Sequence, residues 1–386
     1  MKFLLIYVPN LRFSNPYKLR KVRLGDICTI TGGYAFDSHK MKQQGEYQII
    51  KMGNLYNGIF DLSRNQSFIN APTKKELEYL IQKNDILITL TGTTNKKDYG
   101  YTVQIEKPKK LLLNQRCALI RASKVNEKYL FYLLNSNDFL KQFYASSTGG
   151  TGNQTNVSIN DMLDFKVYIS NENDQLKISN ILNALDKKIS TQIKIINDYK
   201  ILKNHIIKSF IKQNGTSYLL SEIAELGRGR VINSAEISKQ KNPIYPVYSS
   251  QTSNNGIMGY LDNYDYEGEY ITWTTDGANA GTVYYRNGKF NCTNVCGILK
   301  IKNGYDAYYI SNILNCYTKK YVSTNLANPK LMNNVMANIK INLPSIEQQK
   351  HSSKILQSIE YRVEIEEDIK LNLVKQKAFL LKNMFI

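Results

Sequence analysis

Two long stretches of the chain carry hydrophobic residues at the spacing of an amphipathic helix. In the first stretch, alternating steps of four and three from residue 178 reach mostly apolar positions: Ile178, Leu182, Leu185, Ile189, Gln192, Ile196, Tyr199, Lys203, Ile206 and Phe210. Apolar residues that recur every 3.5 positions form one continuous stripe along a helix. The pattern predicts a helix within 169–211 and another within 343–385, each a rod of about 60 Å.

The second stretch matches the first without a gap, and every matched pair stands 174 positions apart, as Leu182 and Leu356 do. Such a match indicates duplication of a structural unit. The second stripe is more polar and consists of Ser352, Leu356, Ile359, Val363, Glu366, Lys370, Leu373, Lys377, Leu380 and Met384. We expect the two helices to pack as an antiparallel coiled coil, with the polar stripe residues fixing the register. Alternatively, each helix packs on its own neighbouring domain.

The repeat extends beyond the helices into the segments that precede them. The stretch VRLGDICTITGG at 22–33 resembles YLLSEIAELGRG at 218–229, and NQRCALI at 114–120 resembles TNVCGIL at 293–299. The chain therefore follows the order globular segment, helix, globular segment, helix. The predicted domains are 1–158, a strand and helix at 159–213, a second globular domain at 214–334, and a strand and helix at 335–386.

Within the globular segments, aromatic and β-branched residues alternate between Gly, Asn and Asp turns, which is typical of short strands. The predicted strands fall within 47–60, 85–92, 117–123, 245–250, 269–291 and 296–302. Helical periodicity covers 127–146 and 306–322. The predicted fold class is α+β: two globular α+β domains separated by two long antiparallel helices that form an intramolecular coiled coil, with a pseudo-two-fold internal repeat.

The charge balance favours a polyanionic partner. Lys and Arg total 51 against 32 Asp and Glu, a formal net charge of +19. Each phosphate contact made by such residues releases counterions. An A+T-rich genome, which favours Lys codons, is the alternative explanation. The apolar run at 3–8 is too short to span a bilayer, so we expect a cytoplasmic protein.

The cysteines and histidines give no sign of a metal site. Five cysteines accompany only three histidines, and none of the histidines is near Cys292 and Cys296. A zinc site needs more ligands than this. The stretch NCTNVC at 291–296 is interpreted as a strand with one buried face.

Taken together, these stretches resemble the specificity subunit of type I DNA restriction–modification systems over essentially the whole chain. VPNLRF at 8–13 followed by VRLGDI at 22–27 looks like the entry into the family's first target-recognition domain. DGANAGTVYYRNGKF at 276–290 is similar to the core of such domains, and INLPSIEQQKHSSKIL at 341–356 looks like the family's strand, proline and helix start. The first copy departs from this pattern, with Ser170 for the proline and Asn173–Asp174 for EQ, which predicts a weaker helix cap.

The resemblance implies a protein without an active site or a cofactor of its own. Each target-recognition domain would read one half of a bipartite sequence in double-stranded DNA. The paired helices would set the unread gap and dock two methyltransferase (modification) subunits, which use S-adenosylmethionine to methylate adenine. A separate ATP-dependent restriction subunit would join them. S-adenosylmethionine, ATP and Mg are therefore expected on the partner subunits.

Base edges are read by Arg, Lys, Asn, Gln and small polar side chains, and phosphates are held by Lys and Arg. Polar residues at strand ends are therefore candidates for DNA contact. In the first domain they are Lys51, Asn54, Thr91, Thr93, Thr94, Asn95, Lys96, Lys97 and Arg116. In the second they are Arg228, Arg230, Ser250, Gln251, Thr252, Ser253, Asn254, Asn255, Thr275, Asp276 and Asn279. The alternative for each is a solvated turn, and Trp273 is interpreted as a core residue.

Two other functions are considered. A self-contained DNA methyltransferase or nuclease is suggested by NPIY at 242–245, which approaches the Asn-Pro-Pro-Tyr signature that grips a flipped adenine. It lacks the second proline, and neither a glycine-rich cofactor strand nor a phosphate loop accompanies it. The glycine group at 148–155 lacks the lysine of a nucleotide site and is interpreted as a loop. A coiled-coil scaffold without a nucleic-acid role explains the helices but not the charge.

Overall fold

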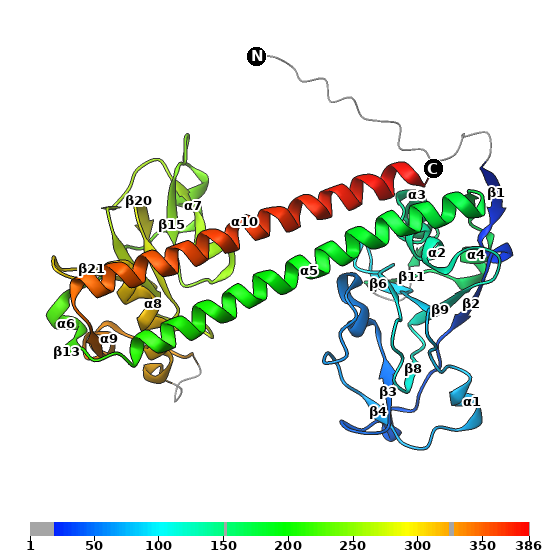
Figure 1. The fold of residues 1–386 in the computed structure, drawn as a ribbon, viewed down its shortest axis with the longest axis horizontal. Helices are drawn as coiled ribbons and strands as arrows, with labels where there is room; N and C mark the ends of the chain where they lie inside the picture. The colour runs from blue at the N-terminus through cyan, green and yellow to red at the C-terminus, as the bar shows by residue number, and fades with distance from the viewer. Residues whose placement is uncertain (1–18, 150–152, 324–327, 386) are drawn as a thin grey trace, which may run out of the picture. The chain divides into compact units, whose positions relative to one another are not determined.

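The chain forms two compact units that each contain parts of both long helices. The computed structural model describes residues 19–149, 153–323 and 328–385, so the predicted entry motif at 8–13 lies outside the described residues. The first unit comprises Met1–Gln192 with Ile369–Ile386, and the second comprises Ile193–Asp368. The long helices are α5, Glu172–Ile211, and α10, Ile346–Met384, and one part of each belongs to each unit (Figure 1).

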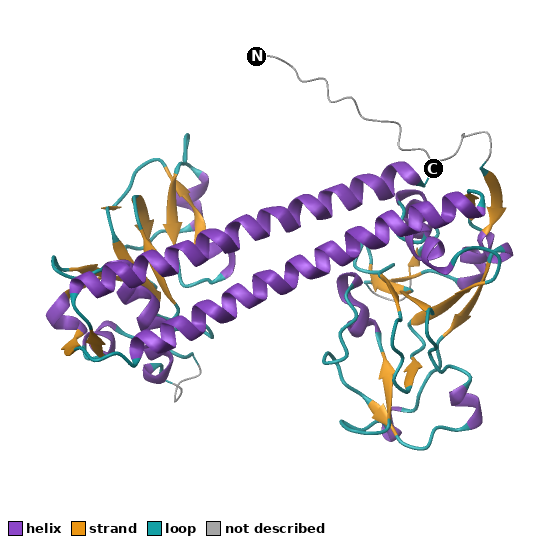
Figure 2. Cartoon of the chain, viewed as in Figure 1, coloured by secondary structure: helices purple, strands orange, loops and turns teal. Residues whose placement is uncertain are grey.

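The first unit is built on two small sheets (Figure 2). An antiparallel sheet has the order β2-β9-β5-β7, with strands Cys28–Gly32, Cys117–Ala122, Ile86–Thr89 and Thr102–Gln104. A second sheet has the order β4-β3-β8, with strands Phe68–Ile69, Tyr47–Ile50 and Leu111–Leu113. In that sheet β3 runs parallel to β8. Each sheet carries a row of buried aliphatic residues, which form the core of the unit.

The remaining elements of the first unit surround these sheets. Strand β1, Arg20–Arg23, pairs with β12, Lys166–Ile169, directly before α5. A three-stranded sheet at one edge has the order β10-β11-β6, with strands Thr148–Gly149, Gln154–Asn156 and Thr91–Thr93. The short helices are α1 Lys74–Leu77, α2 Glu127–Leu133, α3 Asn137–Ala145 and α4 Ile159–Asp164, with 3-10 turns at Leu24–Asp26, Ser38–Lys40 and Met52–Gly58.

The second unit repeats this topology. Its antiparallel sheet has the order β14-β21-β18-β19, with strands Ala224–Arg228, Cys296–Ile301, Tyr270–Thr274 and Val283–Arg286. Its second sheet has the order β16-β15-β20-β17, with strands Ile257–Leu261, Tyr245–Tyr248, Lys289–Cys292 and Tyr266–Glu267. Here too the central strands β15 and β20 run parallel. Before α10, β22 Lys340–Leu343 pairs with β13 Thr216–Leu219.

Helices complete the second unit. They are α6 Leu220–Ile223, α7 Ser234–Ser238, α8 Ala307–Tyr317 and α9 Asn333–Ala337, with 3-10 turns at Ser253–Gly256 and Thr318–Tyr321. Leu220 and Ile223 are fully buried, as Leu24 and Ile27 are at the matching positions of the first unit. Trp273 is fully buried and its indole N–H donates to the carbonyl of Leu331 at 3.0 Å, which confirms that it is a core residue.

Several predicted elements are shorter than the periodicity indicated. The helix expected over 127–146 is two helices, because the hydroxyl of Ser136 accepts a hydrogen bond from the amide of Phe139 and starts a new helix. The strand expected over 47–60 stops at Ile50 and continues as a 3-10 turn. The glycine group at 148–155 includes parts of β10 and β11 rather than a plain loop, although 150–152 lie outside the described residues.

The predicted stripe of each long helix is confirmed by burial. Every one of the predicted positions is buried or half-buried in α5 and in α10. The polar stripe residues Gln192 and Glu366 are among the buried residues, whereas the stripe lysines are half-buried. In the second unit Lys200 pairs with Glu367 at 2.8 Å and Lys203 pairs with Glu360, so rising numbers in α5 meet falling numbers in α10. The helix segments within this unit are therefore antiparallel.

The start of α5 is locked to the first unit by one buried side chain. The Gln175 carbonyl accepts from the amide of Asn126 at 3.0 Å, and its NH2 donates to the carbonyl of Ser170 at 2.8 Å. Asn126 is itself the N-cap of α2, and the Ser179 hydroxyl lies 3.2 Å from its side-chain oxygen. The start of α5 is thus fixed against the cap of α2.

The second unit contains the same contact. The Gln349 carbonyl accepts from the amide of Asp306 at 3.0 Å, and its NH2 donates to the carbonyl of Pro344 at 2.9 Å. Asp306 is the N-cap of α8, and the hydroxyl of Ser353 donates to its carboxylate at 2.8 Å. Gln175 and Gln349 are 174 positions apart, so this glutamine clamp belongs to the duplicated frame.

A second repeated contact ties the middle of each long helix to its unit. Asp186 of α5 accepts from the Tyr132 hydroxyl at 2.8 Å and from Lys377 of α10 at 2.6 Å. Burial and the Asp186 carboxylate raise the pKa of Tyr132. The second unit builds the same arrangement from Glu360, Tyr308 and Lys203.

The weaker cap predicted for α5 is wrong. The side-chain oxygen of Asn171 accepts from the amide of Asp174 at 3.0 Å, and its NH2 donates to the Asp174 carboxylate at 2.8 Å. At α10 the amide of Ser345 donates to the side-chain oxygen of Gln348 at 3.2 Å, and the amide of Gln348 donates to the hydroxyl of Ser345 at 3.4 Å. Asn is as good an N-cap residue as Ser, so the departure from the second copy still caps the helix.

We predict that Leu182→Ala and Leu356→Ala each destabilise the protein. Both leucines are essentially fully buried in the stripe, and truncation leaves a cavity, so the expected loss is about 2–5 kcal/mol in the free energy of unfolding. Denaturant unfolding of the full chain measures it. Leu176→Ala is the matched control, because this leucine of α5 is 48% exposed. An unchanged midpoint for Leu182→Ala would contradict the buried stripe.

Candidate nucleic-acid interface

In each unit, the ends of corresponding strands lie together at one edge. In the first unit the backbone amide of Asn114 donates to the carbonyl of Ile50 at 3.0 Å. The backbone amide of Leu90 donates to the carbonyl of Arg116 at 3.0 Å. These bonds bring together the end of β3, the end of β5 and the β8–β9 turn. In the second unit the backbone amide of Thr293 donates to the carbonyl of Tyr248 at 2.8 Å, and the backbone amide of Thr275 donates to the carbonyl of Val295 at 3.2 Å.

A glycine permits the close backbone crossing beneath each edge. A Cβ at Gly33 would lie 2.1 Å from the carbonyl oxygen of Asn114, and one at Gly229 would lie 2.0 Å from that of Cys292. No side chain fits at such a distance, so both positions require glycine. The residues that follow them, Tyr34 and Arg230, form parallel bridges to Asn114 and Thr293. The frame of the edge is therefore the same in both units.

Most candidates of the first unit lie together at this edge. Strand β6 pairs with β11, and the segment that follows is a tight turn in which Asn95 has a φ of 63°. The Asp98 carboxylate accepts from the amide and the hydroxyl of Thr93 at 2.8 and 2.7 Å, which lowers the pKa of Asp98. Thr94, Asn95, Lys96 and Lys97 are exposed on the turn. This turn therefore presents two lysines on a fixed backbone.

Lys51 and Arg116 complete the first edge, because they follow β3 and precede β9. Arg116 is exposed and Lys51 is half-buried. Within the described part of the chain, no ion pair engages Lys51, Lys96, Lys97 or Arg116. Thr91 and Thr93 are half-buried, and the Thr91 hydroxyl lies 3.1 Å from the side-chain oxygen of Asn156. The four cations are therefore available to an external anion.

Asn54 lies at the first edge but is fully buried, unlike the other candidates. Its NH2 donates to the carbonyls of Asp61 and Arg64 at 2.9 and 2.6 Å, and its oxygen accepts from the amide of Lys51 at 2.9 Å. Every hydrogen bond that the amide group commonly makes is used to hold the 52–64 loop. Asn54 therefore supports the edge and does not present a group to a ligand.

In the second unit, two separate candidate loops meet. The NH2 of Asn279 donates to the hydroxyl of Thr252 at 3.0 Å, which joins the β18–β19 connection to the 250–255 loop. Ser250 and Thr252 are half-buried, whereas Gln251, Ser253, Asn254 and Asn255 are exposed. Asn254 and Asn255 both have left-handed backbones, with φ of 48° and 52°. Thr275 is fully buried, so it anchors this edge and is not exposed on it.

The charged candidates of the second unit already have partners. Arg230 donates to Glu236 at 2.6 and 3.1 Å and to Asp265 at 3.0 Å, which raises the pKa of Arg230. Arg228 donates to the side-chain oxygen of Asn333 at 3.0 Å. Asp276 pairs with Lys330 at 3.5 Å. DNA contact by Arg230 requires the guanidinium to leave two carboxylates, so Arg228 is the more available arginine.

Arg286 beneath the second edge was not predicted from the sequence. It is nearly fully buried, its guanidinium lies 3.6 Å from the Tyr248 ring centroid and 4.4 Å from that of Tyr284, and it donates to the carbonyl of Asn255 at 2.8 Å. Desolvation lowers the pKa of Arg286. This arginine braces the 250–255 loop from below. Only its place directly after two tyrosines in TVYYRNG hinted at such a role.

The exposed residues Gln115 and Asn294 were also missed. Both occupy the second position of the aligned stretches NQRC and TNVC, and Asn294 lies beside Val295, whose carbonyl receives the amide of Thr275. The alignment places Arg116 at Val295, so it pointed to this turn, and Asn294 is the exposed polar residue there. The same turn is therefore polar at both edges.

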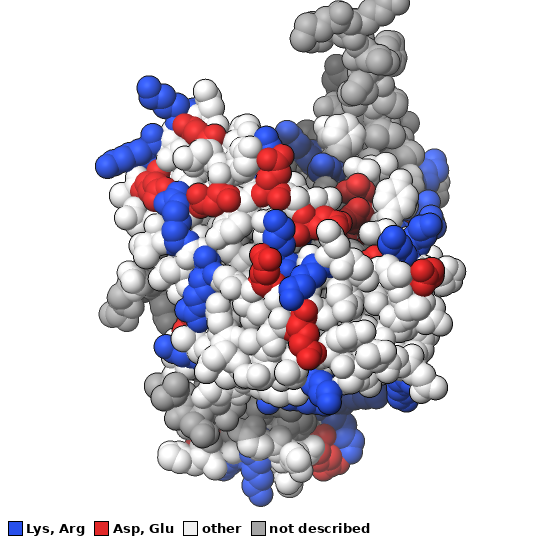
Figure 3. All heavy atoms as spheres, turned by 90° about the vertical axis from the view of Figure 1, so that its left-hand side faces the viewer, with Lys and Arg blue, Asp and Glu red and all other residues white. Residues whose placement is uncertain are grey.

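One face of the second unit carries side chains of both charges. The face of the second unit drawn in Figure 3 mixes Lys and Arg with Asp and Glu. On this face, phosphate contact would therefore depend on individual cations rather than on a continuous basic patch.

The described residues contain no cluster of metal ligands, and two of their buried cysteines have raised thiol pKa values. No group of three or more His, Cys, Asp or Glu among them is placed to hold a metal ion, and none of their helices is long and apolar enough to cross a membrane. Burial raises the pKa of Cys117 to about 12, and Cys28 behaves likewise. Cys292 ends β20 and Cys296 begins β21, so NCTNVC spans a turn between two strands, not the single strand predicted.

Comparison with known proteins identifies the fold and the family. The family model described as the type I restriction modification DNA specificity domain matches residues 16–198 and again 214–376. The chain belongs to this family. The double match coincides with the duplication found in the sequence and in the sheets.

Relatives and solved structures agree. A putative type I specificity subunit N-terminus from Mycoplasma pneumoniae is 43% identical over 142 residues, 36% of this chain and 75% of the relative. The type I restriction enzyme MpnII specificity subunit from the same organism is 42% identical over 146 residues, 37% of this chain and 43% of that protein. A type I restriction–modification S subunit from M. genitalium has the same fold, with a TM-score of 0.62 at 16% identity over 98% of this chain and 99% of that one.

As a member of this family the chain is a specificity subunit, the non-catalytic component that recognises DNA and acts with other subunits of a type I restriction–modification complex. The resemblance inferred from the repeated stretches is thereby confirmed, as is the α+β fold with two long antiparallel helices. Specificity subunits carry no cofactor of their own.

We predict that Arg116→Gln and Asn54→Ala have opposite signatures. Arg116 is exposed and without an ion pair, so its loss should leave stability within about 0.5 kcal/mol and reduce the slope of log K against log salt by about 0.9. Asn54→Ala leaves buried groups unpaired and should cost about 1–3 kcal/mol of unfolding free energy. Denaturant unfolding and DNA binding across a salt series separate them. Normal stability of Asn54→Ala would refute the supporting role.

Proposed function

We propose that each unit of this specificity subunit reads one half of a bipartite sequence in double-stranded DNA, through the edge described above. The supporting observation is that one backbone frame occurs twice with different exposed side chains. The first edge presents Lys96, Lys97 and Arg116, and the second presents Asn254, Asn255 and Asn279. Asn and Gln suit adenine and Arg suits guanine, so two such edges read different half-sites.

The proposed reading residues are a subset of the candidates from the sequence. In the first unit they are Lys51, Thr91, Thr93, Thr94, Asn95, Lys96, Lys97 and Arg116. In the second they are Arg228, Arg230, Ser250, Gln251, Thr252, Ser253, Asn254, Asn255, Asp276 and Asn279. Asn54 and Thr275 are assigned to support, because both are fully buried. The proposed domains remain 1–158 and 214–334 for recognition, with 159–213 and 335–386 as the strand-and-helix segments.

The long helices are proposed to set the unread gap between the half-sites. Each is continuous, and the glutamine clamps fix where each helix starts relative to a recognition domain. A change in helix length would then change the spacing and leave both half-site sequences unaltered.

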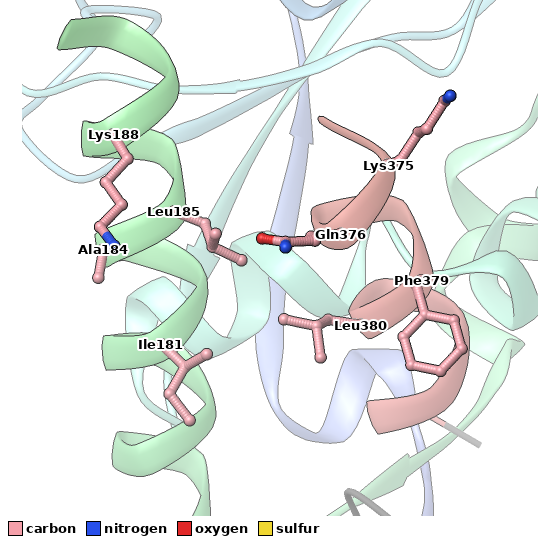
Figure 4. A pocket seen from close by; sticks show the side chains of 8 residues that line it. All are labelled: Ile181, Ala184, Leu185, Lys188, Lys375, Gln376, Phe379 and Leu380. Carbon is pink, nitrogen blue, oxygen red and sulfur yellow. The ribbon is translucent and has the colours of Figure 1, made fainter. Parts of the chain in front are cut away.

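The helices are also proposed to dock two methyltransferase subunits. In the first unit Ile181, Leu185, Phe379 and Leu380 line an apolar groove of about 670 Å³ between α5 and α10 (Figure 4). Phe379 is 42% exposed there. The repeat places Ile355, Ile359, His205 and Ile206 at the matching positions of the second unit. Related helix positions in both units suit two copies of one partner.

The remaining parts of the complex follow from this assignment. The methyltransferase subunits would carry S-adenosylmethionine and methylate adenine, and an ATP-dependent restriction subunit would use ATP and Mg. The complex would act on DNA in the cytoplasm. A self-contained methyltransferase is less well supported, because NPIY precedes and enters β15 at Tyr245, with Asn242 and Ile244 exposed on the surface.

We predict that deletion of this gene removes one bipartite methyl-adenine motif from the source cell. The chain directs its partners to the motif, so the methyltransferase alone should not modify it. Long-read methylome sequencing before and after deletion measures the change. Re-expression of the chain is the control and should restore the motif. An unchanged methylome, with the methyltransferase shown to be expressed, would contradict the proposed function.

We predict that exchange of residues 22–156 for the same segment of another specificity subunit alters one half-site only. The second edge lies wholly within Ile193–Asp368 and has its own frame, so its half-site should be retained. The methylome of cells expressing the chimera tests this. The reciprocal exchange of the second domain is the control. A change in both halves would show that the units do not read independently.

A further inference from the structure

The loop that follows β3 has the same design as the loop that follows β15. Lys51–Gly58 and Ser249–Gly256 have equal length, and each leads from a strand paired in parallel with β8 or β20. Asn57 and Gly58 have φ of 57° and 70°, and Asn255 and Gly256 have φ of 52° and 82°. Equal loop length places Tyr56 of the first unit at the position of Asn254, a candidate reading residue of the second, and the backbone φ differs there, −59° at Tyr56 and 48° at Asn254.

Tyr56 is an exposed aromatic residue on a rigid base. Its side chain is 53% exposed, and its ring packs edge-on against Tyr101 at 5.7 Å between centroids. The guanidinium of Arg64 lies 5.6 Å from the Tyr56 ring centroid. The buried Asn54 holds both the start of this turn and the carbonyl of Arg64, so the ring and the cation are kept together.

The aromatic surface continues towards the Thr93–Asp98 turn. The Tyr144 hydroxyl donates to the carbonyl of Tyr99 at 3.1 Å, and it would lie 3.5 Å from a Cβ at Gly100, the residue before Tyr101. The ammonium of Lys97 lies 5.2 Å from the Tyr144 ring centroid. A row of three rings with a cation at each end thus extends from the candidate edge: Lys97, Tyr144, Tyr101, Tyr56 and Arg64.

The acidic groups near this row are engaged by neighbouring residues. The Asp98 carboxylate accepts two hydrogen bonds from Thr93. The Asp61 carboxylate accepts from the amide and hydroxyl of Ser63 and lies 3.3 Å from Arg64. The Arg64–Asp61 pair is exposed on the surface and therefore weak. Arg64 can exchange this partner for a phosphate at little cost.

We propose that this row contacts the sugar–phosphate backbone of duplex DNA beside the first half-site, with Tyr56 at its centre. The inference rests on the proposed function. Exposed tyrosine hydroxyls donate to phosphate oxygens, and Lys and Arg neutralise them. The row fixes the position of the duplex on the first edge, and of its members only Lys97 is also among the proposed reading residues. The second unit lacks it, because Asn254 and Thr282 occupy the positions of Tyr56 and Tyr101.

The test uses the full chain and two duplexes, one with its methylated motif and one with that motif scrambled. Arg64→Gln and Lys97→Gln should each reduce the salt slope by about 0.9, because each removes one phosphate contact. Tyr56→Ala should weaken both duplexes about 5-fold at fixed salt, the value of about one hydrogen bond. Tyr56→Phe removes the hydroxyl and keeps the ring, so it should show most of the same loss in DNA affinity.

Tyr264→Ala and Lys289→Gln are matched controls. The Lys289 ammonium lies 4.4 Å from the exposed Tyr264 ring, but Lys289 starts β20, at the end of that strand opposite the candidate edge. Both variants should bind as the wild type does. Melting temperatures verify that every variant is folded. The Tyr56 variants should fold normally, because this side chain is exposed.

The outcomes distinguish this inference from the proposed function. Wild-type affinity and slope in Arg64→Gln, Lys97→Gln and Tyr56→Ala would overturn the DNA row while leaving recognition intact. Normal DNA binding with reduced methylation in the assembled complex would also overturn it, because the row would then serve a protein partner. A wild-type chain and assembled complex that bind neither duplex would instead count against the proposed function.

Discussion

The buried glutamine clamp determines how each unit is assembled. In each unit the side-chain oxygen of one glutamine accepts from the backbone amide of an N-cap residue, and its NH2 donates to the backbone carbonyl just before a long helix. The donor–acceptor distances are 2.8–3.0 Å. Because a buried polar group that loses its partner costs about 1–3 kcal/mol, the long helix and the short helix cannot separate freely. The strand pairs β1–β12 and β13–β22 lead into the same junctions. The edge and the helix start are thereby held in one rigid relation.

On this frame, the two edges differ almost entirely in exposed side chains. Gly33 and Gly229 keep the same backbone crossing, and the amides of Asn114 and Thr293 make the same bond. Above the crossing, one edge presents lysine and arginine and the other presents asparagine. The division between a repeated backbone and variable side chains is what a subunit that reads two different half-sites requires.

The sequence predicted the frame better than the edge. Heptad spacing and the 174-residue offset identified both helices, because a long stripe averages over many residues. Residue type alone did not separate Asn54, which is buried, from Lys96, which is exposed, since both are polar residues of turns. Arg286 was missed because its role depends on Tyr248 and Tyr284, which only the folded sheets bring to it. Tyr56 was missed because its loop matches 249–256 in length and in the closing Asn-Gly pair but hardly elsewhere in sequence.

The supporting residues lie beneath each edge and the exposed ones lie above it, which has an evolutionary consequence. Asn54 and Arg286 hold their loops from inside, whereas Asn95, Lys96 and Asn254 extend outward from strand ends and pack against no core. Exposed substitutions at such positions usually change stability by no more than about 0.5 kcal/mol. A lineage can therefore pass from one recognised sequence to another through intermediates that all fold. With the proposed reading residues, drift in target preference therefore meets little resistance from the fold.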